Sequence, residues 1–202
     1  MTTMDTHTDS RTRITNAAAE LFYVEGFESV GLQKICTQAM VSKSSFYHFF
    51  KSKDEVAVAV ADAHWQKVQH GFAQLLDSSL SPLQKIHAIF DNVINQAEIT
   101  CSERGAIFGC PFGNLASELS NSNPDLREKI QLVFDYVIDI YIDLIKQAKR
   151  QGELSADMEA RETANALLAA MQGLNIMGKV YNDPARMRRN GELTLSLILG
   201  VV

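Results

Sequence analysis

Apolar residues recur every three or four positions along most of the chain, which is the spacing of one face of an α-helix. Three of these apolar stripes are long and cover residues 56–75, 130–148 and 164–177. No segment alternates apolar and polar residues over enough positions to predict a β-strand. The pattern therefore predicts an all-α protein. The expected helices cover residues 10–25, 32–38, 43–49, 53–77, 82–100, 112–120, 124–151, 157–181 and 184–200.

Helix start and stop signals support these boundaries. Ser52 and Glu55 have the spacing of a capping box, in which the hydroxyl accepts from the third helical N–H and the carboxylate reaches back. Three further starts pair a capping side chain with a proline, which suits the first helical position. These pairs are Ser81-Pro82, Asn123-Pro124 and Asp183-Pro184. Gly26 and Gly152 follow apolar stripes and are expected to end helices in the left-handed conformation.

Residues 30–50 have the pattern of a helix-turn-helix. Leu32, Ile35 and Ala39 form the inner stripe of a first short helix, residues 39–41 make the turn, and Ser42 caps a second short helix. Phe46, together with Phe49 or Phe50, is expected to pack inward because these positions lie three or four residues apart. The aromatic rings of this segment are therefore expected to serve two purposes, some in the core and some on the surface.

The outward face of the second short helix has the chemistry of a DNA-reading surface. Short hydroxyl side chains permit close approach to the major groove, and a lysine, a phenol and an imidazole supply donors for base edges and phosphates. Tyr47, Lys51 and Lys53 are expected nearer the phosphate backbone, where contacts position the protein rather than specify sequence. The candidate DNA-binding residues are Gln33, Ser42, Lys43, Ser44, Ser45, Tyr47, His48, Lys51 and Lys53.

Composition and charge narrow the class of protein. The 202 residues carry a net charge of −5, but residues 1–53 hold six Lys/Arg against five Asp/Glu, while the remainder holds 13 against 19. An anionic partner is thus expected at the amino-terminal quarter. The three cysteines form no paired framework, which suggests a reducing compartment. Residues 1–13 are polar and resemble a short disordered arm rather than a signal peptide. No apolar run is long enough to span a bilayer. We therefore expect a cytoplasmic protein.

The segment "RITNAAAELFYVEGFESVGLQKICTQAMVSKSSFYHFFKSKDEV" resembles the DNA-binding domain of the TetR/AcrR family of repressors. The matching positions are Ala17-Ala18, Leu21-Phe22, Gly26-Phe27, Ile35, Val41-Ser42-Lys43, Tyr47-His48-Phe49-Phe50 and Ser52-Lys53-Asp54. The resemblance implies a nine- to ten-helix fold, with a helix-turn-helix domain over residues 1–52 and a ligand-binding and dimerisation domain over residues 53–202. It also implies a homodimer on double-stranded operator DNA, because paired modules read the half-sites of a palindrome.

Two positions depart from the family pattern. Val30-Gly31 stands where the family has a Thr or Ser that opens the first short helix, so Ser29 is a candidate for that hydroxyl. Met40 stands where the family has a glycine in the turn. A positive φ at Met40 would cost roughly 1 kcal/mol or more, so either the turn differs or stability is lost there.

The last two expected helices are more apolar than one core stripe requires. Small and apolar residues cover broad faces of residues 157–181 and 184–200. Excess apolar surface usually contacts a partner, which predicts a four-helix dimer interface. Burial within one subunit is the alternative.

Residues 101–120, "CSERGAIFGCPFGNLASELS", interrupt the helical pattern with recurring glycines and a proline. A break between helices can open a cavity, and ligand sites in bundles lie between helices. The candidate ligand-binding residues are Trp65, Phe72, Phe90, Phe108, Cys110, Phe112, Asn114, Tyr136, Met171 and Asn175. Taken singly, each aromatic residue is better explained as ordinary core, whereas taken together they favour a pocket.

The same segment resembles a subset of TetR-type repressors that respond to small electrophiles or unsaturated acids. Cys110 precedes Pro111 and the expected start of a helix, where backbone amides stabilise a thiolate. Cys110 is thus either a reactive sensor, with Cys101 as a candidate resolving thiol, or a small buried hydrophobe.

The sequence therefore predicts a ligand-responsive transcriptional regulator, most readily a repressor that a small-molecule inducer releases from its operator. An activator of the same fold and a helical interaction protein without specific DNA binding are the alternatives. No HExxH, GxSxG, Walker or CxxC motif occurs, so we expect no enzyme activity, no metal site and no cofactor.

Overall fold

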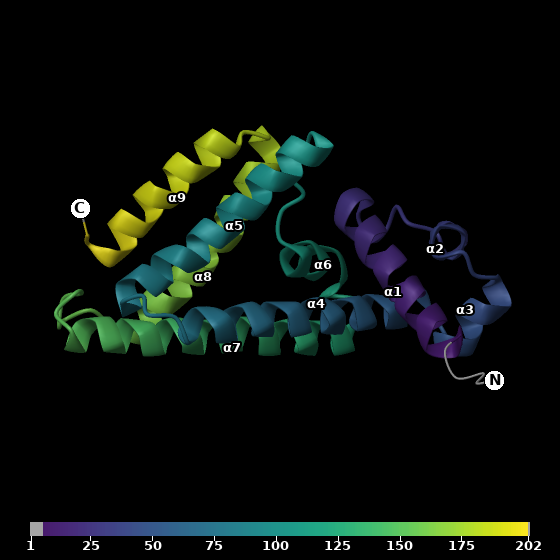
Figure 1. The fold of residues 1–202 in the computed structure, drawn as a ribbon, viewed down its shortest axis with the longest axis horizontal. Helices are drawn as coiled ribbons and strands as arrows, with labels where there is room; N and C mark the ends of the chain where they lie inside the picture. The colour runs from purple at the N-terminus through teal and green to yellow at the C-terminus, as the bar shows by residue number, and fades with distance from the viewer. Residues whose placement is uncertain (1–5, 202) are drawn as a thin grey trace. The chain divides into compact units, whose positions relative to one another are not determined.

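The computed structural model describes residues 6–201, with side chains from Ser10 onward. Within this range the secondary structure is helical, without strands, so the predicted all-α class is confirmed (Figure 1). The helices are α1 (Thr6–Glu25), α2 (Leu32–Ala39), α3 (Lys43–Phe49), α4 (Lys53–Leu76), α5 (Pro82–Arg104), α6 (Pro111–Leu119), α7 (Pro124–Arg150), α8 (Ala160–Tyr181) and α9 (Pro184–Leu199).

The proline-marked helix starts form the hydrogen bonds that their sequences predict. Ser81 accepts from the backbone N–H of Gln84, whose side chain in turn accepts from Ser81 N–H at 2.9 Å, which completes a capping box. Asn123 Oδ1 accepts from Leu126 N–H, and Asp183 Oδ1 accepts from Arg186 N–H, each at 2.9 Å. These caps explain why α5, α7 and α9 begin at their prolines.

Several details differ from the sequence prediction, among them the start of α8, which is Ala160 instead of residue 157. α1 begins at Thr6, inside the segment that we expected to be a disordered arm; residues 1–5 of that arm lie outside the described part. α5 continues to Arg104 instead of ending near residue 100, because Gly105, with φ 77°, is the residue that caps it. At α4, Ser52 accepts from Glu55 N–H as expected, but the Glu55 carboxylate accepts from Lys51 N–H at 2.6 Å rather than from Ser52.

The chain forms two compact units. The first, which we call the amino-terminal unit, comprises the described residues up to Gln69 together with Pro111–Gln131. The second, the core unit, comprises His70–Cys110 and Leu132–Val202, of which Val202 lies outside the described residues. Both α4 and α7 contribute to each unit, and α6 belongs wholly to the first. The functional boundary predicted after residue 52 remains a prediction.

The core of the amino-terminal unit is built where α2 and α3 pack on α1. Phe46 is 0% exposed, and its ring lies 5.9 Å from that of Phe50, which is also buried. Ile35 of α2 and Phe22 of α1 are buried too. Phe46 and Phe50, rather than Phe49, are thus the inward-facing rings.

α6 and the start of α7 are tied to this unit by polar contacts. The Glu118 carboxylate of α6 accepts from the backbone N–H of Glu28, in the turn after α1, at 3.0 Å. Asn123 Nδ2 donates to Asp54 of α4 at 3.3 Å, and Lys129 forms an ion pair with Asp62 of α4. The turn after α1 leaves little space, since a Cβ on Gly26, where φ is +85°, would lie 3.3 Å from Glu118.

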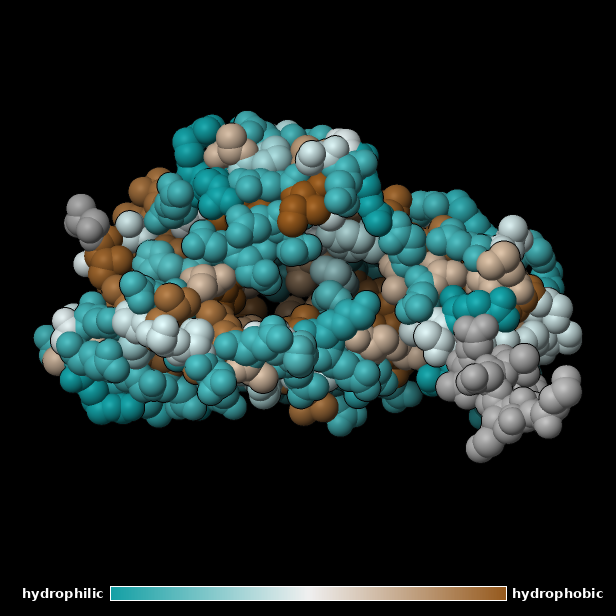
Figure 2. All heavy atoms as spheres, in the orientation of Figure 1, coloured by the Kyte–Doolittle hydropathy of each residue, from teal (hydrophilic) through white to brown (hydrophobic). Residues whose placement is uncertain are grey.

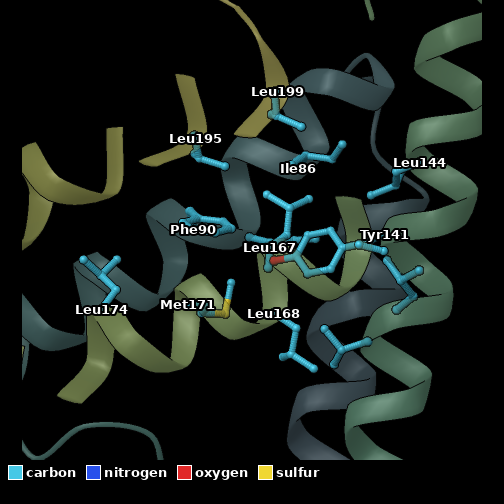
Figure 3. Close-up of a cluster of buried hydrophobic side chains, with 14 of the residues drawn as sticks. Ile86, Phe90, Tyr141, Leu144, Leu167, Leu168, Met171, Leu174, Leu195 and Leu199 are labelled. Carbon is cyan, nitrogen blue, oxygen red and sulfur yellow. The ribbon is translucent and has the colours of Figure 1, made fainter. Parts of the chain in front are cut away.

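In the core unit, aliphatic and aromatic side chains from α5, α7, α8 and α9 form one buried cluster (Figure 3). We call this set the hydrophobic cluster; Phe90, Tyr141, Leu167 and Leu195 represent its four helices. α9 lies beside α5 and α8 in Figure 1, and Gly191 permits the close approach. A Cβ there would lie 2.8 Å from Ile94 Cδ1 of α5 and 3.3 Å from Leu174 Cδ2 of α8.

The segment between α5 and α6 is held by Asn182, the residue that ends α8 with a φ of 49°. Its Oδ1 accepts from Ile107 N–H and its Nδ2 donates to the Gly105 carbonyl, both at 2.9 Å. Asn182 thus satisfies two backbone groups of a non-helical stretch that would otherwise need water. None of the helices in the described residues is long and apolar enough to cross a bilayer.

His64 is half-buried in α4, where its ring lies 4.8 Å from that of Phe112 in α6. Burial, reinforced by the charge of Lys67, lowers the pKa of His64 below its ordinary value of 6.5. The folded chain therefore holds this proton less tightly than the unfolded chain does. The stability contributed by neutral His64 is present above about pH 6.5 and is lost as the pH falls towards the lower pKa of the folded state.

A His64→Gln variant is accordingly expected to be less sensitive to acid. Urea titrations at pH 7.5 and 5.5 should show a smaller loss in the free energy of unfolding for His64→Gln than for wild type. His70, which is exposed, provides the matched control, and His70→Gln should behave as wild type. An equal loss in wild type and His64→Gln would contradict this role.

Candidate nucleic-acid interface

The turn between α2 and α3 is tight and depends on Met40. Met40 has φ 53° and ψ 48°, the left-handed conformation, so the sequence departure from glycine does not change the turn. Its N–H donates to the Thr37 carbonyl at 3.2 Å, and Val41 N–H donates to the Cys36 carbonyl at 3.0 Å. The strain expected for a methionine at positive φ is therefore present. The residue before α2, Gly31, makes no side-chain cap, so the proposed capping role of Ser29 is not observed.

The start of α3 is fixed by Ser42. Its Oγ accepts from the Ser45 N–H at 3.1 Å, as an N-cap hydroxyl should, and lies 2.8 Å from Ser44 Oγ. Two hydroxyls are thus grouped at the amino end of the helix. The amide groups at such an end favour an anion such as a phosphate.

Beyond the cap, α3 separates its inward and outward faces sharply. Phe46 is 0% exposed, whereas its neighbour Tyr47 is 57% exposed. Lys43 is exposed one turn before Tyr47, so the ammonium and the phenol lie on the same face. Ser44 and His48 are also exposed, and Ser45 is half-buried. The outward face therefore carries the hydroxyl, amine, phenol and imidazole groups that major-groove recognition uses.

The remaining predicted DNA contacts differ in how exposed their side chains are and in whether their donors are already used. Gln33 is exposed on α2 and Lys51 is exposed in the turn after α3. Lys53 is half-buried, and its Nζ donates to the Phe27 carbonyl at 2.9 Å and lies 4.0 Å from the centre of the Phe27 ring. Lys53 thus holds the turn after α1 to the start of α4 and has fewer donors left for a phosphate.

We expect Lys51→Ala to make DNA binding less salt-dependent. Loss of one phosphate contact should make the slope of log affinity against log salt shallower by about 0.9. Fluorescence anisotropy with a labelled operator, measured between low and moderate salt, gives this slope. Lys146→Ala, which removes an exposed lysine of α7, is the matched control. An unchanged slope in Lys51→Ala would remove Lys51 from the interface.

The ten candidate ligand residues are divided between the two units. Trp65, Phe112 and Asn114 belong to the amino-terminal unit, and the others belong to the core unit. Those others are Phe72, Phe90, Phe108, Cys110, Tyr136, Met171 and Asn175. Most are buried or half-buried, and Tyr136 is the most exposed.

Within the core unit the structure brings several of these residues together. Phe90 and Met171 belong to the hydrophobic cluster (Figure 3). Asn175 Nδ2 donates to the Met171 carbonyl at 2.9 Å, and the rings of Phe72 and Tyr136 meet nearly edge to face with centroids 6.2 Å apart. Cys110 Sγ lies 3.8 Å from Gln172 Nε2 of α8. The segment around Cys110 therefore contacts the same helix that supplies Met171 and Asn175.

Three residues with informative positions were not singled out from the sequence. Asn182 follows an apolar stripe, and asparagine is a known helix-ending residue, so a local signal was available. Tyr141 falls on a buried position of the stripe over residues 130–148, but its isolation from polar partners is visible only in the fold. Glu118 gave no signal, because its partner Glu28 is 90 residues away in the sequence.

Comparison with known proteins agrees with this arrangement. Residues 14–60 match the model of bacterial regulatory proteins of the tetR family, and residues 82–193, more than half of the chain, match the tetracyclin repressor-like C-terminal domain. The transcriptional regulator AcuR of Cereibacter sphaeroides is 30% identical over 173 residues, which are 83% of this chain and 75% of that protein. The transcriptional repressor NemR of Escherichia coli K12 is 27% identical over 180 residues, 88% of each chain.

A solved structure shows the same fold. The TetR transcriptional regulator of Chloroflexus aurantiacus superposes with a TM-score of 0.82 and 26% identity over 95% of each chain. Proteins of this kind are DNA-binding regulators rather than enzymes. The chain therefore belongs to the TetR family and is a transcriptional regulator with an amino-terminal helix-turn-helix DNA-binding domain.

Proposed function

We propose that this regulator is a cytoplasmic repressor that binds a palindromic operator as a homodimer and is released by a small-molecule inducer. The observation that carries the DNA part is α3, where a cap at Ser42 and a buried Phe46 leave Lys43, Tyr47 and His48 facing outward. An activator of the same fold would use the same surface and differ in where its operator lies.

Exposed apolar residues on α8 and α9 support the dimer. Ile176, Val180 and Leu197 are 65%, 72% and 74% exposed, and Leu193 is 60% exposed. Figure 2 shows hydrophobic atoms at the surface near the carboxyl end of α9. Large side chains exposed together on two adjacent helices favour a partner surface, and a second copy supplies the same helices by symmetry.

An inducer can release DNA only if it binds preferentially to a form of the protein that binds the operator poorly. α4 is the candidate lever, because it starts directly after the turn that follows α3 and its end belongs to the core unit. α6 is a second candidate, since Glu118 contacts the backbone of the turn after α1. By linkage, operator DNA must weaken inducer binding by the same factor by which the inducer weakens operator binding.

Cys110 remains our candidate for covalent induction. The residue is half-buried, is in no disulfide, and lies directly before Pro111, the first residue of α6. Amides at a helix start stabilise a thiolate, and the thiolate sulfur can add to an electrophilic carbon while the electrophile takes up a proton. An electrophilic or unsaturated molecule bound to Cys110 would lie beside Gln172 of α8, where it can favour the conformation that binds the operator poorly.

Operator binding measured before and after treatment with N-ethylmaleimide tests this response. Wild type and Cys101→Ser, the matched control, should release the operator, whereas Cys110→Ser should retain it. Undiminished release by Cys110→Ser would leave Cys110 as part of the pocket wall and point to a reversible ligand. A wild-type protein without any specific operator would favour the alternative of a helical interaction protein.

A further inference from the structure

Tyr141 presents a polar group in the most apolar part of the molecule. Its side chain extends from α7 into the hydrophobic cluster, towards α5 and α8, and is 0% exposed (Figure 3). Phe90, Leu167 and Met171 belong to the same cluster. Within the described residues the Tyr141 hydroxyl has no hydrogen-bond partner.

The other buried polar side chains behave differently. Thr15 Oγ1 donates to the Arg11 carbonyl at 3.1 Å, Asn123 Oδ1 accepts from Leu126 N–H, and Asn175 Nδ2 donates to the Met171 carbonyl. A buried hydroxyl without a partner destabilises the fold, because it gives up its hydrogen bonds to water and gains none in return. Phenylalanine would fill the same space without that cost, so the fold alone gives no reason for a hydroxyl here. Such a group needs a function or an additional partner.

The surroundings define what that partner can be. Burial raises the pKa of Tyr141 well above its ordinary value, so the phenol stays protonated and can donate. The cluster around it is built from apolar side chains. A charged ligand group would lose its hydration there without gaining a counter-ion, which is strongly unfavourable. A neutral acceptor, such as the oxygen of a ketone or an ester, gains a hydrogen bond at no such cost.

The cluster can adapt to an occupant. Met171 is unbranched and flexible, so it can be repositioned with little strain. Phe72, Phe134 and Ile138 pack against the cluster but are only partly buried, which offers a route inward. A ligand can therefore open this site by displacing side chains, as occurs when a minor conformation becomes the dominant one.

We propose that the Tyr141 hydroxyl is the hydrogen-bond donor of a ligand site inside the core unit, which takes a neutral, largely apolar molecule with a single acceptor. The inference rests on the proposed ligand response and adds to it the chemical class of the ligand and the residue that recognises it. Occupation of the site would satisfy the hydroxyl and displace α8 side chains. It needs no covalent chemistry at Cys110.

Two probes of the same shape test the proposal. Acetophenone carries a carbonyl where α-methylstyrene carries a methylene group, and affinities for both are measured by calorimetry with wild type and with Tyr141→Phe. The ratio of the two affinities should be about tenfold larger in wild type than in Tyr141→Phe, as one desolvated hydrogen bond predicts. Comparing ratios cancels the difference in hydration between the probes.

Controls separate this proposal from the proposed function. Tyr181→Phe, a change at an exposed tyrosine of α8, should keep the wild-type ratio. The Tm of Tyr141→Phe should equal or exceed that of wild type, because an unpartnered hydroxyl is removed. An unchanged ratio, a lowered Tm, or no binding of either probe to wild type would overturn the role of Tyr141. Operator binding, measured on the same samples, tests the proposed function separately from the role of Tyr141. If wild type bound no operator, the proposed function would be overturned instead.

Discussion

A double variant with Lys43→Ala and Tyr47→Ala is expected to bind the operator at least about 100-fold more weakly than wild type, with an unchanged Tm. Both side chains lie on the outward face of α3, one turn apart, and neither belongs to the buried core. Recognition contacts of this kind contribute about 1–3 kcal/mol each, so two of them together account for the expected loss. Fluorescence anisotropy gives the affinity, and thermal unfolding gives the Tm.

The matched control removes the charge and length of a lysine outside the helix-turn-helix. Lys146→Ala shortens an exposed lysine on α7, far along the sequence from the helix-turn-helix, and should bind the operator as wild type does. A double variant that binds like wild type would show that the outward face of α3 does not read DNA. A double variant that has lost stability would mean that Lys43 or Tyr47 supports the fold.

Phe46→Ala, by contrast, is expected to lower stability. The free energy of unfolding of the amino-terminal unit should fall by about 3–5 kcal/mol. Phe46 is fully buried, and its ring contacts those of Tyr47 and Phe50. Truncation leaves a cavity where α3 meets its core. Hydrogen exchange of the α1–α3 amides, together with urea unfolding, measures the loss.

Phe49→Ala is the comparison for this variant. Phe49 is only half-buried and packs edge to face against His48. The Phe49→Ala change should lower the free energy of unfolding clearly less than Phe46→Ala does, because Phe49 buries less apolar surface on folding. A larger loss in Phe49→Ala than in Phe46→Ala would invert the assignment of inner and outer rings.

The helices could be predicted from the sequence because their signals are local. Ser81 with Gln84, Asn123 and Asp183 cap helices through bonds that span three residues, so the sequence determines them without knowledge of the fold. The end of α5 was less clear, since residues 101–104 have no strong helix breaker and Gly105 decides it.

The helix-turn-helix was also predictable, but the choice between neighbouring rings was not. Phe49 and Phe50 both suit the spacing from Phe46, and only the packing of α2 and α3 on α1 selects Phe50. Lys53 was expected on the DNA side, whereas its ammonium group is engaged with Phe27. Such contacts depend on a fold that brings distant turns together, which local patterns do not describe.

Contacts between residues far apart in the sequence were harder to predict for the same reason. Asn182 and Ile107 are separated by 75 residues, and Glu118 and Glu28 by 90. Tyr141 matched an apolar stripe, so periodicity alone assigned it to the core and gave no sign of its unpartnered hydroxyl. Long-range polar contacts, and the lack of a contact at a buried polar group, can be recognised only once the three-dimensional structure is known.

The central claim is that α3 places this regulator on a specific operator. Hydroxyl-radical footprinting on the DNA upstream of the protein's own gene tests it most directly, with wild type and the Lys43→Ala, Tyr47→Ala variant side by side. We predict that wild type protects a short palindrome and that the variant, at the same concentration, does not. Equal protection by both proteins, or uniform protection without a palindrome, would contradict the account.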